Sequence, residues 1–500
     1  MTDADRPNVL LVVLDSVRAA NTSLHGHEHA TTPFLEEFAD RATVFEQARS
    51  PGTWSLPSHA AIFTGYHVAE HGVTRARHRL EPGHTVFEEL RDEHGYATGV
   101  FSENTWITDM DVGLKEAFDT VEGARNLLFP DAIDPSNFVL TEGQGKYLEF
   151  LRYCLGRDDT LRSLANGAYT KLAWDYPGLL PDRFSSSTPA DVYTDLLLDW
   201  ADERDGPWAA CVNYMDGHLP YLPADEHDLW GGDRLRDLQA EMDDQVWEFV
   251  GGQRPWWQRR ALEGLYDGTI HQMDAELRRL VGALAERGTL EDTLLVVTSD
   301  HGEGFGELSR VRCTRDSDRP NVRSSGHGDG LHEVLLHVPL VVKAPGQTGG
   351  ERVDGVASLT QFPDAVRAAI GESSAPTDAA PPDAASAFVP AEPVVASSHG
   401  QEEPMEERAR EYTGDTYAFN GTARAVFEGA GQDVVKYLTW RDRAATVRTP
   451  EAKCGYRTAA DDGGRVDERF ADIADRGVRT DEDGEIDEAT QRRLADLGYR

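Results

Sequence analysis

Continuous apolar runs recur along the first two-thirds of the chain. The first, residues 9–14, consists of Val and Leu and ends at Asp15. A strand that is apolar at every position is buried on both faces, as the central strands of parallel sheets are. This run therefore predicts a central parallel strand. Four similar runs predict further strands at residues 97–101, 208–214, 294–298 and 338–342.

The clearest helical pattern lies within residues 262–284, where apolar residues recur at spacings of three and four. Such spacing places them on one face of a helix. Strands that alternate with helices predict an α/β fold, a mainly parallel central sheet sandwiched by helices. Ligands of such sheets bind at the carboxyl ends of the strands. Asp15 and Asp300 both follow strands, so we expect them to face one crevice.

The composition changes after residue 371, which predicts that a first, large domain spans residues 1–371. Residues 372–393 are rich in Ala, Pro, Ser and Asp, as loops and linkers are. Residues 394–500 predict a small antiparallel α+β subdomain, with strands at 423–428 and 434–440 and a solvated acidic tail at 479–488. Residues 123–194 carry no recognisable motif, and we interpret them as a helical insertion near the site.

The charge of the chain is strongly negative, with 88 acidic and 49 basic residues giving a net −39, and only six of the basic residues are Lys. Such a surface repels nucleic acid and anionic membranes, so we expect neither as a partner. Carboxylates hold water in strong salt, where screening removes their mutual repulsion. We therefore expect a halophilic, haloarchaeal-type protein. Disorder of the whole chain is disfavoured by its 43 aromatic residues.

The chain shows no signal for export or anchoring. The N-terminus lacks the charged and apolar regions of a standard signal peptide. No apolar run reaches the ~18 residues that a membrane-spanning helix needs. We therefore expect a cytoplasmic protein without membrane insertion. The cysteines form no C-x-x-C pair and predict neither a disulfide framework nor a zinc site; they are Cys154, Cys211, Cys313 and Cys454.

A candidate nucleophile stands at the start of a predicted helix. In the stretch Thr-Trp-Ser-Leu-Pro-Ser-His, Ser55 precedes a Pro that fits a first helical turn, and the helix ends at Gly65. A helix N-terminus offers oriented N–H groups and a positive dipole end, which suit chemistry on an anionic ester. Taken alone, the stretch equally fits an ordinary capped helix.

Two acids and a histidine form a candidate cation site. Asp15, Asp300 and His301 follow predicted strands. Carboxylates bind hard ions such as Ca²⁺ or Mg²⁺, and an imidazole extends the choice to Mn²⁺ or Zn²⁺. The alternative for Asp15 is an N-cap of a helix that follows the strand.

Five motifs follow one another over residues 7–371. They are Pro-Asn-Val-Leu-Leu-Val-Val-Leu-Asp-Ser from Pro7, Ser-Leu-Pro-Ser-His from Ser55 with Phe-Thr-Gly and His71-Gly72, Gly-His-Leu-Pro-Tyr from Gly217, Ser-Asp-His-Gly-Glu from Ser299, and His327-Gly328 leading to Glu333 and Val-Pro-Leu from Val338. In this order they resemble the sulfatase branch of the alkaline phosphatase superfamily. The order is far more specific than any single motif.

The resemblance implies one divalent cation and a modified nucleophile. Asp15, Asp300 and His301 match the family's metal ligands, and the oxygen of Ser55 matches a further ligand. We expect Ca²⁺, with Mg²⁺, Mn²⁺ or Zn²⁺ as alternatives. Ser55 matches the Cys or Ser that a maturation enzyme oxidises to formylglycine. In the family the hydrated aldehyde attacks sulfur, and the sulfated diol then expels sulfate.

Four further residues are candidates for the catalytic machinery, and the resemblance supplies the roles of two of them, His218 and His327. His218 matches a histidine near the leaving oxygen, which would serve as general acid or contact the sulfate. His327 matches a residue that contacts the transferred group, where an imidazolium would stabilise negative charge. His59 stands where the family has Arg and can still hold the nucleophile or an anionic oxygen. Arg18 would add a positive contact or, equally, pair with acids; Glu303 and His71 are interpreted as supporting residues.

Departures from the family pattern keep several activities open. Ser16 replaces a second acid and His301 replaces Asn, and the Asp-His form also occurs in phosphonate monoester hydrolases and lipoteichoic-acid-synthase-like phosphotransferases. Asn104 stands near the place of the sulfate-gripping Lys and His of arylsulfatases and is a candidate donor. The leading hypothesis is a divalent-metal-dependent sulfuric ester hydrolase acting on a sulfated carbohydrate or small organosulfate.

Two alternatives stand beside this hypothesis. The first is a phosphodiesterase, phosphonate monoester hydrolase or phosphoryl-headgroup transferase that uses unmodified Ser55 to form a covalent ester. The second is a catalytically silent binding protein. The tetrahedral shape shared by sulfate and phosphate esters means that the scaffold alone does not separate the first alternative from a sulfatase.

Overall fold

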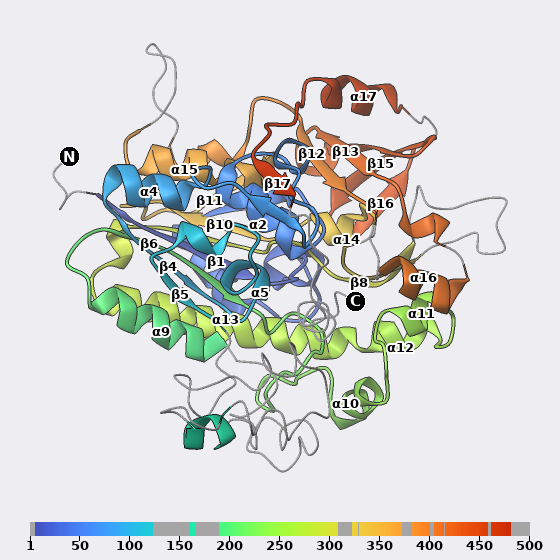
Figure 1. Cartoon of the computed structure of the whole chain (residues 1–500), viewed down its shortest axis with the longest axis horizontal. Coiled ribbons are helices and arrows are strands. Elements are labelled where there is room, and N and C mark those ends of the chain that lie inside the picture. The colour runs from blue at the N-terminus through green and yellow to red at the C-terminus, as the bar shows by residue number, and fades with distance from the viewer. Residues whose placement is uncertain are drawn as a thin grey trace.

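An eight-stranded sheet forms the centre of the molecule (Figure 1). The computed structural model describes residues 6–123, 154, 160–165, 190–308, 323–328, 330–372, 383–400, 405–414, 416–458 and 462–481. The strands in spatial order are β11 (Glu351–Ser358), β2 (Thr43–Arg49), β10 (Leu340–Lys343), β7 (Thr293–Thr298), β1 (Asn8–Leu14), β6 (Trp208–Tyr214), β4 (Ala97–Phe101) and β5 (Thr120–Glu122).

Every pairing in this sheet is parallel except those of β10, which runs antiparallel to both β7 and β2. All five strands predicted from apolar runs belong to it, which confirms the mainly parallel α/β fold. β10 begins two residues later than the run at 338–342. Pro339 lies in that gap, and proline has no N–H to donate to a strand ladder.

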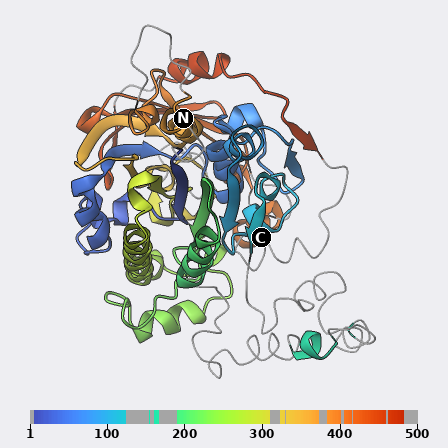
Figure 2. The same cartoon turned by 90° about the vertical axis from the view of Figure 1, so that its left-hand side faces the viewer.

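Helices cover both faces of the sheet. One face carries α2 (Ser55–Thr64), α4 (Val86–His94) and α15 (Phe362–Ala369). The other carries α1 (Pro33–Phe38), α9 (Ala190–Asp202) and α13 (Glu263–Glu286), and Figure 2 shows α9 and α13 side by side. The helical pattern at 262–284 corresponds to α13. Further helices are α3 (Val68–His71), α5 (Thr105–Thr108), α10 (Asp233–Ala240), α11 (Trp247–Val250), α12 (Trp256–Ala261), α14 (Glu333–Leu336) and α16 (Met405–Thr413).

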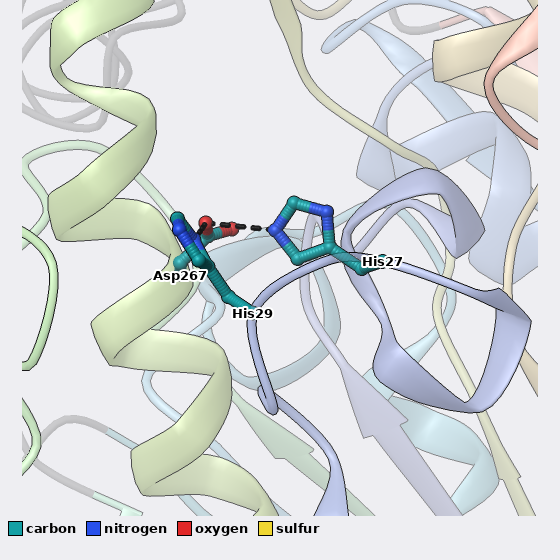
Figure 3. Close-up of side chains that lie close together, drawn as sticks. All are labelled: His27, His29 and Asp267. Carbon is teal, nitrogen blue, oxygen red and sulfur yellow. Dashed lines mark hydrogen bonds and ion pairs between the residues drawn. The ribbon is translucent and has the colours of Figure 1, made fainter.

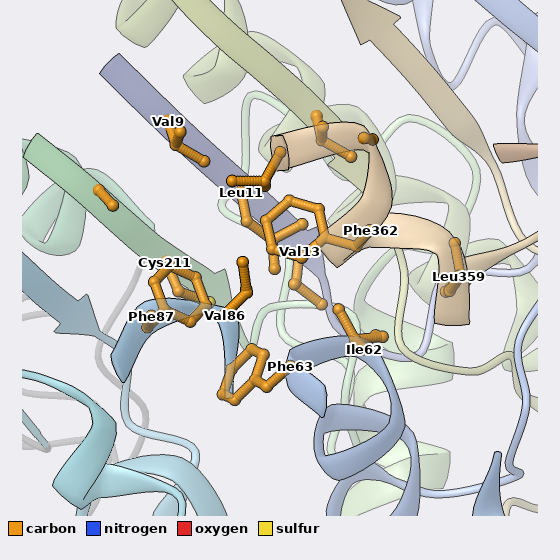
Figure 4. Packing of buried hydrophobic residues seen from close by; sticks show 14 of the residues in the cluster. Val9, Leu11, Val13, Ile62, Phe63, Val86, Phe87, Cys211, Leu359 and Phe362 are labelled. Carbon is orange, nitrogen blue, oxygen red and sulfur yellow. The ribbon is translucent and has the colours of Figure 1, made fainter. Parts of the chain in front are cut away.

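The alternation of side chains along β1 divides the core into two layers. Val9, Leu11 and Val13 pack with Ile62 and Phe63 of α2 on one face (Figure 4). The intervening residues of β1 point to the opposite cluster under α1, α9 and α13. Because both sets are buried, the strand is apolar from Val9 to Leu14, as expected of a strand at the centre of the sheet that is buried on both faces.

A second, antiparallel sheet lies beside the first, drawn in orange and red in Figure 1. Its strands are β12 (Val394–Ser398), β13 (Ala423–Glu428), β14 (Val435–Trp440), β15 (Arg443–Glu451) and β16 (Cys454–Arg457), paired in that order. Helix α17 (Gly464–Ala471) packs on it through Val466 and Phe470. The N–H of Ser397 donates to the Pro51 carbonyl at 3.1 Å, so this sheet touches the segment that precedes α2.

Several predicted segments differ from expectation or fall outside the described residues. The acidic stretch at 479–488 begins as β17 (Arg479–Asp481), paired with β3 (His78–Leu80), and its remainder lies outside the described part. Most of the proposed insertion at 123–194 also lies outside it. In the stretch 372–393, Phe388 is buried against the main core. The domain boundaries at 371 and 394 stay a prediction.

A short hairpin of β8 (Gly304–Leu308) and β9 (Arg323–Gly326) follows the central strand β7. It lies near the carboxyl ends of the parallel strands and carries residues that pack around the candidate site. Among the described residues, every helix is too short or too polar to span a membrane.

Candidate active site

Two neighbouring central strands bring Asp15 and Asp300 together. Asp15 follows β1 and Asp300 follows β7, and these strands pair directly. The two turns are joined by hydrogen bonds: the Ser16 N–H donates to Asp300 Oδ1 at 3.3 Å, and the Val17 N–H donates to Ser299 Oγ at 2.9 Å. Ser16 adopts a left-handed φ of 61°, which places its hydroxyl 2.8 Å from Asp15 Oδ1.

The ligand atoms of Asp15, Asp300 and His301 all lie within 4.8 Å of one another, and all three residues are fully buried. Asp300 Oδ2 makes no hydrogen bond in the described part of the chain and lies 3.4 Å from His301 Nε2. His301 Nδ1 donates to the Gly302 carbonyl at 3.0 Å, which leaves Nε2 with its lone pair facing the acids. This donor set fits a divalent cation.

Electrostatics support that fit. Burial opposes ionisation of Asp300, but the imidazoles of His301 and His59 outweigh it and lower the pKa of the carboxyl. Burial likewise opposes protonation of His301, and the negative charges of Asp300 and Asp15 outweigh it and raise the pKa of the imidazole. The two buried acids thus favour a positive charge on this imidazole. A bound cation would supply that positive charge instead.

Helix α2 presents Ser55 to the acids, as predicted. Ser55 is its first residue, after Trp54 in an extended conformation, and the helix ends at Gly65 with a left-handed φ of 74°. Ser55 is fully buried, and its Oγ lies 3.4 Å from His301 Nε2. His59, one turn later, donates from Nδ1 to the Ser55 carbonyl at 2.9 Å, and Nδ1 lies 3.6 Å from Asp300 Oδ2.

Two further predicted histidines lie beside His301. The ring of His327 is 4.5 Å from that of His301 and 5.0 Å from that of His218. His327 Nδ1 donates to Glu303 Oε2 at 3.0 Å. Burial and the neighbouring His301 nevertheless lower the pKa of His327 to about 4. At neutral pH the free protein therefore holds this ring neutral, and an anionic ligand would favour its protonation. The expected imidazolium beside the transferred group stays a prediction.

Arg18 follows the second of its two alternatives. The residue is 3% exposed, and its guanidinium forms ion pairs with Glu263 at 2.5 Å and Glu307 at 2.6 Å. It also donates to the Glu303 carbonyl at 3.1 Å. The guanidinium thus stabilises the loop after His301. A direct contact of Arg18 with substrate stays a prediction.

Buried polar side chains support the site residues from behind, and two of them, Asn213 and Arg259, were not singled out from the sequence. Asn213 of β6 donates to Asp15 Oδ2 at 3.2 Å, and a polar residue inside an apolar strand was the available signal. Asn104, expected as a donor to substrate, instead donates to the same oxygen at 3.1 Å. Arg259 forms an ion pair with Glu303 at 2.7 Å, and both side chains are fully buried. Because the fixed carboxylate of Glu303 also accepts the hydrogen bond from His327, it positions that ring.

Residues 7–371 match the family model described as Sulfatase. The chain belongs to the sulfatase family. This assignment covers both strand-end acids, the helix that begins at Ser55, and the histidines around them, and it confirms the resemblance to the alkaline phosphatase superfamily. The expectation of a hydrolase of sulfuric esters accords with it.

Curated relatives of this sulfatase-family chain are distant. The multifunctional alkaline phosphatase superfamily protein PehA of Trinickia caryophylli is 23% identical over 385 residues, 68% of this chain and 69% of the relative. The steryl-sulfatase of Mus musculus is 24% identical over 400 residues, 73% of this chain and 62% of the relative. The match thus leaves more than a third of the steryl-sulfatase uncovered.

Solved structures share the fold over most of their length. The phosphonate monoester hydrolase of Agrobacterium radiobacter is 17% identical, with a TM-score of 0.58 over 98% of this chain and 95% of that one. A structure described in complex with its substrate D-glucosamine-2-N,6-O-disulfate is 15% identical, with a TM-score of 0.56 over 89% of this chain and 91% of that one. At these identities the likeness concerns the fold.

Proposed function

We propose that this sulfatase-family protein is a divalent-metal-dependent sulfuric ester hydrolase. The observation that carries the proposal is the position of Ser55. Its hydroxyl stands at the buried N-terminus of α2, 3.4 Å from His301 and beside two buried acids. A nucleophile, a cation site and a positive helix end thus converge on one point, which is the arrangement that attack on an anionic ester requires.

Asp15, Asp300 and His301 would hold the cation, with the oxygen on residue 55 as a further ligand. Carboxylate oxygens predominate in this set, which favours Ca²⁺, and the single imidazole also admits Mg²⁺, Mn²⁺ or Zn²⁺. When bound, the cation supplies electrostatic stabilisation of negative charge on the transferred group. Asn104 and Asn213 orient Asp15 from behind by donating to its Oδ2.

Ser55, oxidised to formylglycine by a maturation enzyme and then hydrated, would attack the sulfur atom. The attacking hydroxyl loses its proton to water as the new O–S bond forms, and this bond replaces the bond to the alcohol, whose oxygen takes a proton from His218. Loss of the proton from the second hydroxyl then breaks the bond between carbon and sulfate oxygen and restores the aldehyde. His59 and His327 would contact the sulfate oxygens. The proposed substrate is a sulfated carbohydrate or a small organosulfate.

A phosphoryl-transfer function is the second candidate. Ser55 in place of Cys, and His59 and His301 in place of Arg and Asn, favour it, and the fold is shared with a phosphonate monoester hydrolase. Unmodified Ser55 would then form a covalent phosphoryl ester that water cleaves. The third candidate is a catalytically silent binding protein. The convergence of two buried acids and a nucleophile argues against it.

Mass spectrometry of the tryptic peptide 50–75 separates the first two candidates. Formylglycine makes the peptide lighter by two hydrogen atoms, and fragmentation assigns the change to residue 55. Ser58 in the same peptide is the internal control, because a change there would be unrelated to the proposal. An intact Ser55 in protein that hydrolyses phosphate or phosphonate esters but leaves sulfate esters untouched would overturn the sulfatase proposal.

Substitution tests the site itself. Ser55→Ala removes the nucleophile, so we expect turnover of sulfate esters to fall by about 10³-fold or more. Ser58→Ala, on the same buried helix, removes a hydroxyl that contacts Ser50 and should retain most activity. Asp300→Ala should release the bound cation, measured by elemental analysis of the purified protein. Unchanged hydrolysis in Ser55→Ala would contradict the role of this residue.

A further inference from the structure

A second cluster of metal-binding side chains lies outside the candidate active site. His27 and His29 stand on the loop between the first strand and α1, and Asp267 stands on α13 (Figure 3). Asp267 Oδ2 lies 2.8 Å from His27 Nε2 and 2.6 Å from His29 Nδ1. The cluster shares no residue with Asp15, Asp300 and His301.

The two imidazoles converge on a single oxygen of the carboxylate. The other oxygen, Asp267 Oδ1, accepts a hydrogen bond from Asn21 Nδ2 at 2.6 Å. That bond fixes the carboxylate so that Oδ2 faces the histidines, as a supporting hydrogen bond does for a metal-binding carboxylate. Two imidazole nitrogens and one carboxylate oxygen that lie this close together form a ligand set suited to transition metals.

The surroundings orient the ligands and leave an entry path. The ring of His29 stacks on Trp230, with 4.7 Å between centroids and 10° between planes. The side chains of His27 and Asp267 are 3% and 2% exposed, whereas that of His29 is 34% exposed. An ion can therefore enter from the side of His29, where water would complete its coordination.

We propose that His27, His29 and Asp267 bind a divalent transition-metal ion, with Zn²⁺ as the expected occupant. Ligand distances of about 2.0–2.2 Å around a tetrahedral ion require neighbouring ligand atoms to be roughly 3.3 Å apart. The two histidines must therefore withdraw from Asp267 by about half an ångström. They lie outside any helix or strand, so a small shift of the loop suffices.

The alternative to a metal site is a hydrogen-bonded network of the same three side chains. Substitution of Lys453 distinguishes a metal site from such a network. Its ammonium contacts His27 Nδ1 in the structure. A metal on Nε2 of a neutral imidazole requires a proton on Nδ1, which excludes a donating ammonium there. Lys453 is exposed and can move away, but it competes with the ion. Its removal should therefore strengthen metal binding.

The experiment is a titration of the chelator-treated full-length protein with Zn²⁺, followed by calorimetry, and with Co²⁺, followed by visible absorption. We expect His29→Ala to bind one Zn²⁺ fewer than wild type or to bind it about 100-fold or more weakly, because loss of a supporting partner alone costs 10–100-fold. In Asp300→Ala, where the proposed catalytic ion is lost, the Zn²⁺ site and its Co²⁺ spectrum should remain.

The controls separate loss of a ligand from loss of the fold. His84→Ala removes a half-buried histidine elsewhere and should leave Zn²⁺ stoichiometry unchanged. Lys453→Met should bind Zn²⁺ more tightly than wild type. Equal Zn²⁺ stoichiometry and affinity in wild type and His29→Ala would overturn the proposal. So would unchanged or weaker binding in Lys453→Met, a variant that leaves all three ligands in place.

Discussion

Glu303 shows how one buried side chain holds the site residues around it. It is fully buried between Arg259 at 2.7 Å and His327 at 3.0 Å. Burial opposes its ionisation, but the hydrogen bond from His327 and the positive charge of Arg259 outweigh burial and lower the pKa of Glu303 from its usual 4.5 to about 2. The ionised carboxylate is thus a stabilising feature of the folded protein.

The first stability prediction concerns acid. Because the pKa of Glu303 is lower in the folded protein than in the unfolded chain, its contribution is complete above about pH 4.5 and disappears as the pH falls toward 2. A shift of this size corresponds to about 3 kcal/mol. Glu303→Gln should lower the unfolding free energy at pH 7 by about that amount, since it leaves the Arg259 cation buried without its partner.

Urea unfolding at a series of pH values measures the effect. The difference between wild type and Glu303→Gln should be largest at neutral pH and shrink below pH 4.5. Glu46→Gln is the matched control, because Glu46 pairs with the half-exposed Arg352, and such surface pairs contribute about 0–1 kcal/mol. A difference that stays constant from pH 7 to pH 3 would contradict the role assigned to ionised Glu303.

At the scale of the element, the loop after β7 depends on a close approach of two backbones. The Gly302 N–H donates to the Leu335 carbonyl at 2.9 Å, and its own carbonyl accepts the bond from His301. A Cβ on Gly302 would collide with the Val334 carbonyl oxygen and lie 2.9 Å from Arg18 Cβ. The Val334 oxygen belongs to the backbone, and the Arg18 side chain is held by its ion pairs, so neither can easily move away. The loop that contains Gly302 must therefore move instead.

We predict that Gly302→Ala destabilises the protein by about 1–3 kcal/mol and weakens the catalytic cation site by moving His301. Thermal unfolding and metal titration measure the two effects. Gly282→Ala is the control: a Cβ there meets nothing within 4 Å, and alanine in a helix is favoured over glycine by about 0.5–1 kcal/mol. Wild-type stability and metal affinity in Gly302→Ala would show that the loop is more adaptable than its contacts indicate.

The elements that the sequence revealed are those whose burial leaves a continuous pattern. β1 and β7 are buried at almost every position and are apolar at residues 9–14 and 294–297, so the ends of these runs located Asp15 and Asp300. β2 and β11 belong to the same sheet but are interrupted by polar and charged residues, which in β2 are mostly buried. Their sequences therefore carry no such pattern, and the sheet was predicted without them.

At the scale of the whole molecule, the missed site residues are those whose meaning arises from long-range pairing. Arg259 gains its role from Glu303, and His27 gains its role from Asp267 across 240 positions of the chain. The alternation of histidines at 25, 27 and 29 is visible in the sequence, but the carboxylate that joins two of them is placed by α13. The order of the motifs along the chain is enough to locate the catalytic centre. Pairs of residues that are distant in the sequence can be recognised only once the fold is known.

The net charge of −39 acts on the entire molecule and leads to the last prediction. Repulsion among exposed carboxylates opposes the compact state, and salt shortens its range from about 10 Å at 0.1 M to about 3 Å at 1 M. We expect the Tm to rise by several degrees between 0.1 M and 2 M KCl, measured by calorimetry. The rise should be smaller near pH 4.5, where many carboxylates are protonated and repulsion is weak. A Tm that is independent of KCl at pH 7 would contradict both the repulsion and the halophilic character inferred from it.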